Sequence, residues 1–184
     1  MTASITIIED FYPDPDQVRR QALSYQFDFT GRYPGRRSAP FHSNQLRRTF
    51  EDILKLSIAA EPVENFRSQF QIATAADRSW IYADRSTNYA GVIYLTPNAP
   101  AGCGTSFYRH RASGLYRFDP AQGEMLDREG SDDSKWEETD RIANRYNRLI
   151  LYDGKLFHRS TGYFGAGLQD GRLFQVFFFN AEKA

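Results

Sequence analysis

From Phe66 onward the period of the apolar residues changes from helical to alternating in a series of short segments, and this change constrains the fold more than any other feature. Side chains of a β-strand point alternately to its two faces, so the pattern predicts half-buried strands. Gly, Pro, Asn and Asp separate the alternating segments, as expected of turns. The expected strands are residues 66–74, 80–83, 89–95, 105–110, 149–152, 155–159 and 172–180. Many short strands indicate a mainly β domain closed as a jelly roll.

The residues before Phe66 have a different period. Residues 4–8 alternate enough to form an opening strand, and Asp14 followed by Pro15 predicts the start of a helix that ends near residue 24. A second helix is expected to begin near Ser43, with one apolar stripe formed by Leu46, Phe50, Ile53 and Leu54. The Gly- and Pro-rich residues 31–37 are expected to be a loop. Both helices should pack against the outside of the sheet.

The length of 184 residues is typical of a single domain. We expect residues 1–65 to support a β core formed by residues 66–184. A polar, acidic insertion at about 112–146 interrupts that core, and we expect a mobile loop leading into a short helix over 137–146.

The charge balance argues against polyanionic partners. With 23 basic and 23 acidic residues the chain is formally neutral, so neither nucleic acid nor an anionic membrane is expected to bind. The single cysteine excludes an internal disulfide. The N-terminus lacks the pattern of a signal peptide and no apolar run reaches membrane-spanning length, so a cytoplasmic protein is expected. The sequence gives no indication of oligomeric state.

Three chemistry-bearing residues fall on or at the end of expected strands: Asp84, His158 and Arg172. A non-haem ferrous site uses two histidines and one carboxylate, and a nearby arginine can bind a carboxylate with two hydrogen bonds. Each residue also has a simpler interpretation. Asp84 would cap a turn, His158 would be a core histidine bonded to a carbonyl, and Arg172 would pair with an acidic residue at the surface.

Five segments together resemble a known family, and none is specific alone. They are WIYAD at 80–84, YAGVIYLTP at 89–97, GCGTSF at 102–107, LFHRS at 156–160 and GRL at 171–173. In this order they resemble the Fe(II)- and 2-oxoglutarate-dependent oxygenases of the prolyl-hydroxylase-like branch. The segment YPGRR at 33–37 is similar to one in a small bacterial subfamily of unknown function.

The resemblance implies a double-stranded β-helix (a cupin-like jelly roll) with the two N-terminal helices outside. It implies a 2-oxoglutarate-dependent dioxygenase that hydroxylates a small molecule, an amino acid or a peptide. Asp84 and His158 would bind iron, and Arg172 would bind the distal carboxylate of 2-oxoglutarate. Tyr94 would add a hydroxyl to the co-substrate pocket. No further catalytic residue is implied, and the polar insertion would act as a lid.

Two positions depart from the family pattern. Tyr82 stands where the first metal-binding histidine is expected, and Phe174 stands where many members carry Ser or Thr. Two alternatives to an oxygenase therefore stay open: a degenerate, non-catalytic member that acts as a binding or scaffold protein, or a tyrosinate–metal site. Tyr82 is otherwise an aromatic residue that lines the barrel. Of the other histidines, His42 lies on a loop within reach of the site, and His110 is expected at the surface or the pocket rim.

Overall fold

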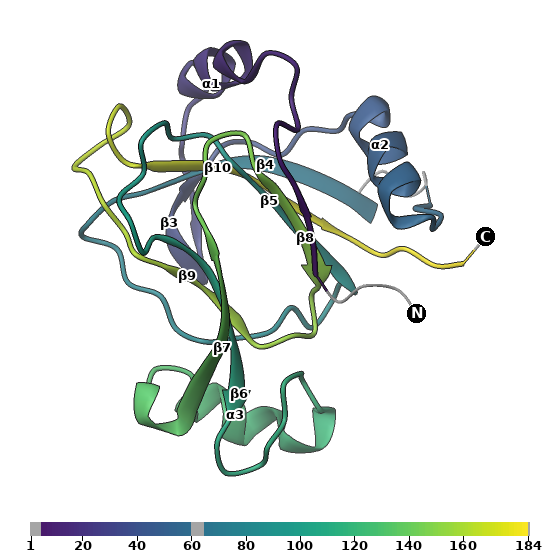
Figure 1. The fold of residues 1–184 in the computed structure, drawn as a ribbon, viewed down its shortest axis with the longest axis vertical. Coiled ribbons are helices and arrows are strands. Elements are labelled where there is room, and N and C mark those ends of the chain that lie inside the picture. The colour runs from purple at the N-terminus through teal and green to yellow at the C-terminus, as the bar shows by residue number, and fades with distance from the viewer. Residues whose placement is uncertain (1–4, 60–64, 184) are drawn as a thin grey trace.

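The computed structural model describes residues 5–59 and 65–183, which form two antiparallel sheets (Figure 1). The larger sheet has the order β1-β8-β5-β10-β4-β3-β2. Its strands are β1 (Ile5–Ile8), β2 (Phe29–Gly31), β3 (Tyr33–Arg37), β4 (Phe66–Ala73), β5 (Tyr89–Tyr94), β8 (Leu149–Asp153) and β10 (Arg172–Phe179). The smaller sheet has the order β7-β6-β9. Its strands are β6 (Gly104–His110), β7 (Trp136–Ala143) and β9 (His158–Thr161).

Two helices cover the outer face of the larger sheet, as predicted (Figure 1). Helix α1 (Pro15–Leu23) is capped by the Asp14 side chain, which accepts a hydrogen bond from the Gln17 amide. Helix α2 (Asn44–Leu54) is capped by Ser43. These side chains satisfy amide groups that have no partner inside the helix. The apolar stripe of α2 buries Phe50 completely against alternate residues of β4 and β10.

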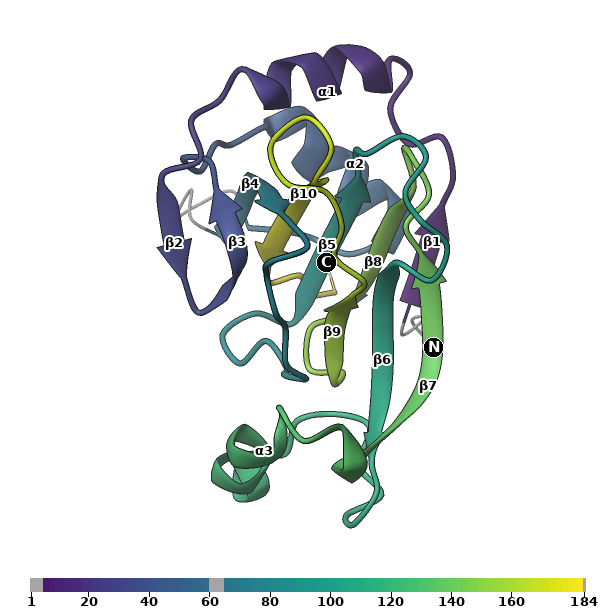
Figure 2. The same ribbon diagram turned by 90° about the vertical axis from the view of Figure 1, so that its left-hand side faces the viewer.

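The inner faces of the two sheets enclose a second core. Val92, Tyr94, Ile150, Phe174 and Val176 from the larger sheet meet residues of the smaller one, including Phe107. Figure 2 shows β6, β7 and β9 lying across the strands of the larger sheet. Alternation along β10 therefore sends Phe177 to the helix-covered face and Phe174 and Val176 to the interior between the sheets.

The predicted loop at residues 31–37 is wrong. These residues complete a hairpin, because β2 and β3 pair with each other and β3 continues onto β4. Gly35 makes this possible: its φ is +75°, and a Cβ there would lie 2.0 Å from the carbonyl oxygen of Ile72. Only glycine tolerates both the dihedral angle and that contact. The residue that suggested a loop is therefore what allows the strand to approach its neighbour.

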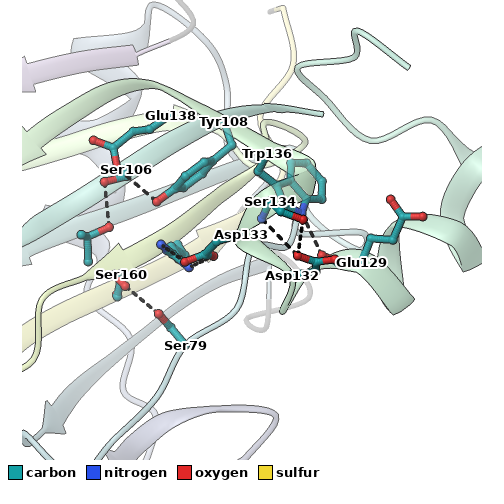
Figure 3. A network of polar contacts seen from close by, with 12 residues as sticks. Ser79, Ser106, Tyr108, Glu129, Asp132, Asp133, Ser134, Trp136, Glu138 and Ser160 are labelled. Atoms are coloured by element: carbon teal, nitrogen blue, oxygen red, sulfur yellow. Dashed lines mark hydrogen bonds and ion pairs between the residues drawn. The ribbon is translucent and has the colours of Figure 1, made fainter. Parts of the chain in front are cut away.

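The predicted helix over residues 137–146 is also wrong. Most of it belongs to β7, which pairs along β6 from His110↔Trp136 to Gly104↔Ala143. Pairing with a neighbouring strand has outweighed local helical preference. The insertion does contain one helix, α3 (Gly123–Glu129), and two short 3₁₀ helices, Pro120–Gln122 and Asp133–Lys135. The Trp136 indole donates to the Glu129 carbonyl and the Asp132 carboxylate caps Ser134, which ties this insertion to β7 (Figure 3).

Two expected strands differ in extent. Residues 80–83 do not form a strand and contribute one isolated bridge, Tyr82↔His158. Strand β9 begins at His158 rather than at residue 155. In the described part of the chain, none of the helices is long and apolar enough to cross a membrane.

Candidate functional site

Main-chain hydrogen bonds bring Tyr82, Asp84 and His158 together. The Tyr82 amide donates to the His158 carbonyl at 3.1 Å, and the His158 amide donates to the Tyr82 carbonyl at 2.9 Å. The Asp84 amide donates to the Gly154 carbonyl at 2.7 Å. The Ser79 hydroxyl donates to the Ser160 carbonyl at 2.7 Å and fixes the other end of the segment against β9 (Figure 3).

The Asp84 carboxylate and the His158 imidazole face each other inside the protein. The Oδ2 of Asp84 and the Nε2 of His158 lie 3.9 Å apart, too far for a hydrogen bond. Both atoms are buried and neither has a hydrogen-bond partner among the described residues. The Nδ1 of His158 lies 2.7 Å from the Leu156 carbonyl oxygen. A carbonyl only accepts, so Nδ1 carries a proton and the Nε2 of neutral His158 presents a lone pair toward Asp84.

Gly154 leaves room for this carboxylate. A Cβ at position 154 would lie 3.2 Å from the Cβ of Asp84 and 3.4 Å from its Oδ2. Burial raises the pKa of the Asp84 carboxyl, while nearby His158 lowers it. The Oδ2 of Asp84 and the Nε2 of His158 are both buried without a hydrogen-bond partner among the described residues, and a cation bound between them would satisfy both atoms.

Tyr82 supplies a poor third metal donor. Its ring packs against the His158 imidazole with centroids 4.5 Å apart. Burial, followed by the charge of Asp84, raises the pKa of the Tyr82 phenol far above neutral pH, so the side chain keeps its proton. A protonated phenol is a weak ligand compared with imidazole or carboxylate.

The other histidines lie elsewhere. His42 contacts the Phe66 carbonyl, with its Nδ1 3.0 Å from that oxygen. His110 is fully buried, and its Nε2 lies 2.8 Å from the Glu129 carboxylate. The prediction that His110 lies at the surface or the pocket rim is therefore wrong. Across residues 5–59 and 65–183, the structure contains no group of three His, Cys, Asp or Glu side chains arranged to hold a metal.

Arg172 is completely buried, and both terminal nitrogens of its guanidinium are already engaged. Nη2 donates to the Gly104 carbonyl at 2.6 Å, and Nη1 donates to the carbonyls of Thr161, the last residue of β9, at 3.0 Å and of Gly162 at 3.2 Å. The Nε is buried and has no hydrogen-bond partner among the described residues. The Cζ atom lies 5.2 Å from the ring centroid of Phe174 and 5.6 Å from that of Tyr163. Carbonyls and ring faces thus solvate the charge without an external anion.

Tyr94 is fully buried, and its hydroxyl lies 2.8 Å from the Thr105 hydroxyl. Neither Tyr94 nor Arg172 is among the residues that line the cavity beside His158. That cavity has a volume of about 30 Å³ and is walled by Phe174, Tyr152 and Tyr163 among others. This is room for roughly two water molecules, which is too little for a dicarboxylate.

The side chains therefore fit the two groups implied by the resemblance unequally. Asp84 and His158 present two suitable metal donors, but the third position holds a neutral phenol. For 2-oxoglutarate the fit fails, because carbonyls occupy the guanidinium of Arg172 and Phe174 fills the adjoining space. Sequence reasoning missed Tyr152 and Tyr163, whose place in the cavity wall becomes visible only when the strands are placed in register.

A family model matches residues 1–178. The chain belongs to DUF6445, a family of unknown function. No curated protein matches the sequence.

Solved structures similar to this chain share its fold at low sequence identity. A prolyl-4-hydroxylase from Pseudomonas putida has a TM-score of 0.55 and 13% identity, with 96% of this chain and 92% of that chain covered. HygX from Streptomyces hygroscopicus, with nickel and 2-oxoglutarate bound, has a TM-score of 0.57 and 14% identity over 96% and 82% of the chains. A prolyl hydroxylase from Trichoplax adhaerens, in complex with a hypoxia inducible factor peptide fragment, has a TM-score of 0.56 and 11% identity over 96% and 83%. This DUF6445 member thus has the jelly-roll fold of the 2-oxoglutarate oxygenases, as the sequence predicted.

Proposed function

We propose that this chain uses the oxygenase fold as a ligand-binding protein and does not catalyse 2-oxoglutarate-dependent oxygenation. The observation that carries the proposal is the environment of Arg172. Both terminal nitrogens already donate to Gly104, Thr161 and Gly162, so a co-substrate carboxylate would find only the buried Nε without a partner among the described residues. Phe174 adds a ring without a hydrogen-bond donor beside it.

The metal donors support the same conclusion. A ferrous centre needs three good protein donors on one face, and the phenol of Tyr82 stays protonated in its buried position. A tyrosinate–metal site would require the metal to displace the phenol proton of Tyr82 as it binds. The small inner cavity is walled by aromatic side chains, and beside it lies a larger outer cavity that Asp84 and Tyr82 help to line. The outer cavity is therefore the place for a ligand.

One observation favours a second candidate, an oxygenase with the altered motif Tyr82-x-Asp84…His158…Arg172. The Oδ2 of Asp84 and the Nε2 of His158 face each other at 3.9 Å without other partners. Two such donors would hold Fe(II) in part, and 2-oxoglutarate would have to displace Phe174 to reach Arg172. The substrate would then be a small molecule or an amino-acid or peptide side chain, the class bound by the similar structures.

The two candidates differ in iron binding and in turnover of 2-oxoglutarate. The native protein, titrated anaerobically with Fe(II) and 2-oxoglutarate, is expected to show no metal-to-ligand charge-transfer band and to release no succinate in air. The double variant Tyr82→His/Phe174→Thr is expected to gain the band, because it restores an imidazole and a donor beside Arg172.

Tyr152→His is the matched control. Tyr152 also packs on His158, with ring centroids 4.8 Å apart, but it lies on β8 outside the motif. This variant is expected to gain no band. A band and succinate release in the native protein would overturn the ligand-binding proposal in favour of the oxygenase.

A further inference from the structure

The interior side chains of β3 and β4 become basic and polar toward one end of the barrel. Arg37 pairs in register with Gln71, and Arg67 lies opposite Phe178 of β10. Because Gln71 and Phe178 both line the enclosed space, alternation places Arg37 and Arg67 on the same face of the sheet as the candidate site. Figure 2 shows β3, β4 and β10 side by side at this edge.

These residues border a cavity of about 550 Å³ that is separate from the small one beside His158. The two cavities share four of their lining residues: Tyr33, Arg37, Tyr82 and Phe178. The two cavities are therefore neighbours, with these side chains between them. Its size is within the range of small-molecule sites.

The charge of this outer cavity is unbalanced. Among residues 5–59 and 65–183, Arg32, Arg37 and Arg67 line it, and Asp84 is the one acidic residue that does so. Within residues 5–59 and 65–183, none of these three arginines forms an ion pair. Half of the other arginines in the described part of the chain form an ion pair.

Arg37 is held in place rather than free to rotate. Its Nε donates to the Gln71 side chain at 2.8 Å, and its guanidinium lies 3.7 Å from the ring centroid of Tyr33 and 5.1 Å from that of Phe178. Burial lowers the pKa of Arg37, which shows that its charge is poorly solvated. Unlike Arg172, its two terminal nitrogens have no hydrogen-bond partner in the described part of the chain. A fixed, poorly solvated guanidinium with free donors is suited to an oxyanion.

We propose that the outer cavity binds a small molecule that carries a carboxylate or phosphate group between Arg37 and Arg67. Arg32, on the β2–β3 turn, adds charge at the rim. The Asp84 carboxylate lies at the other side of the cavity and would repel a second anionic group, so the far end of the ligand is neutral or cationic. This inference rests on the ligand-binding function proposed above and names its ligand class.

The inference is tested with inorganic phosphate and acetate as probes and with uncharged acetamide as the neutral control. Titration of the full chain is followed by two-dimensional NMR, including the arginine Nε signals. Saturable shifts of the signals around Arg37 and Arg67 are expected with at least one oxyanion and not with acetamide. The oxyanion that binds more tightly identifies the recognised group.

Arg36→Gln is the matched control for Arg37→Gln and Arg67→Gln. Arg36 is exposed and adjacent to Arg37, but it pairs with Ile72 and lies on the opposite face of β3. Arg67 is also exposed, so Arg67→Gln should fold normally. Loss of either cavity arginine should weaken binding by about tenfold, and Arg36→Gln should leave it within about twofold.

Equal affinities for native protein, Arg67→Gln and Arg36→Gln would overturn the inference, as would no saturable shift with either oxyanion. These outcomes are distinct from failure of the proposed function, which is decided by the charge-transfer band and succinate release. Binding of phosphate or acetate at the outer cavity is measured without iron or 2-oxoglutarate, so its outcome does not depend on whether the protein is an oxygenase.

Discussion

Replacing Arg172 with methionine is expected to destabilise the protein strongly, because the guanidinium holds three segments of the barrel together. It bonds the carbonyls of Gly104 on β6, Thr161 on β9 and Gly162 just beyond it. Methionine retains much of the aliphatic length but leaves these carbonyls without that donor. A buried acceptor left without its donor costs about 1–3 kcal/mol, so the loss of the bonds to three carbonyls should cost at least about 3 kcal/mol of unfolding free energy. At the lower limit, the melting temperature should fall by roughly 6–12 °C for a chain of this size.

The measurement is urea unfolding followed by tryptophan fluorescence, with Arg159→Met as the control. Arg159 lies on β9, the strand that Arg172 contacts through Thr161. Its guanidinium bonds the carboxylate of Asp133, which is largely exposed. Loss of such an exposed pair should cost under about 1 kcal/mol. Comparable midpoints for the two variants would refute the structural role of Arg172.

Addition of 2-oxoglutarate to the native protein tests whether Arg172 is free to bind a ligand. A ligand at one hundred times its Kd stabilises a protein by about 2.7 kcal/mol. If Arg172 were free to bind the dicarboxylate, saturating 2-oxoglutarate would raise the melting temperature and Arg172→Met would abolish that rise. We expect no Arg172-dependent rise.

Two further predictions concern the scaffold. Phe50→Ala should lower the free energy of unfolding in urea by about 3–5 kcal/mol, because Phe50 is fully buried among aromatic rings of β4 and β10. The control is Phe29→Ala, which should change it by no more than about 0.5 kcal/mol, because Phe29 is 48% exposed. Equal costs would contradict the assigned core. Glu9→Gln should cost under about 1 kcal/mol at pH 7, because the bond from Arg148 lowers the pKa of this partly exposed carboxylate. That stabilisation is present above the unfolded-state pKa and disappears as the pH falls through the lower folded-state pKa, so a difference that grows in acid would contradict it.

Much of the scaffold could be predicted because its signals are local. Asp14 and Ser43 cap the helices that their side chains suggested, and the apolar stripe of α2 meets the sheet through Phe50. Strand β10 is almost the segment predicted from alternation alone. The errors arose where pairing with a distant strand decides the structure, as in β3 beside β4 and β7 beside β6.

The candidate site was predicted in part. The structure brings Asp84 and His158 to 3.9 Å, although their role as metal ligands stays a prediction. It places Arg172 and Tyr94 behind the cavity rather than in it. Their sequence positions could not show this, because the partners of Arg172 are main-chain carbonyls brought close by strands far away in the sequence.

The sequence by itself determined the class of fold, the two capped helices and the alternation that directs each side chain to one face or the other. The resemblance also predicts that Tyr82 and Phe174 stand where related proteins carry side chains suited to metal and co-substrate. Only the tertiary structure decided which polar face lies inside. Alternation along β4 marks Arg67 and Gln71 as one polar face, which a sequence alone assigns to solvent. The hairpin of β2 and β3 turns that face into the wall of a cavity, because Gly35 lets the two chains approach and carries Arg37 inward.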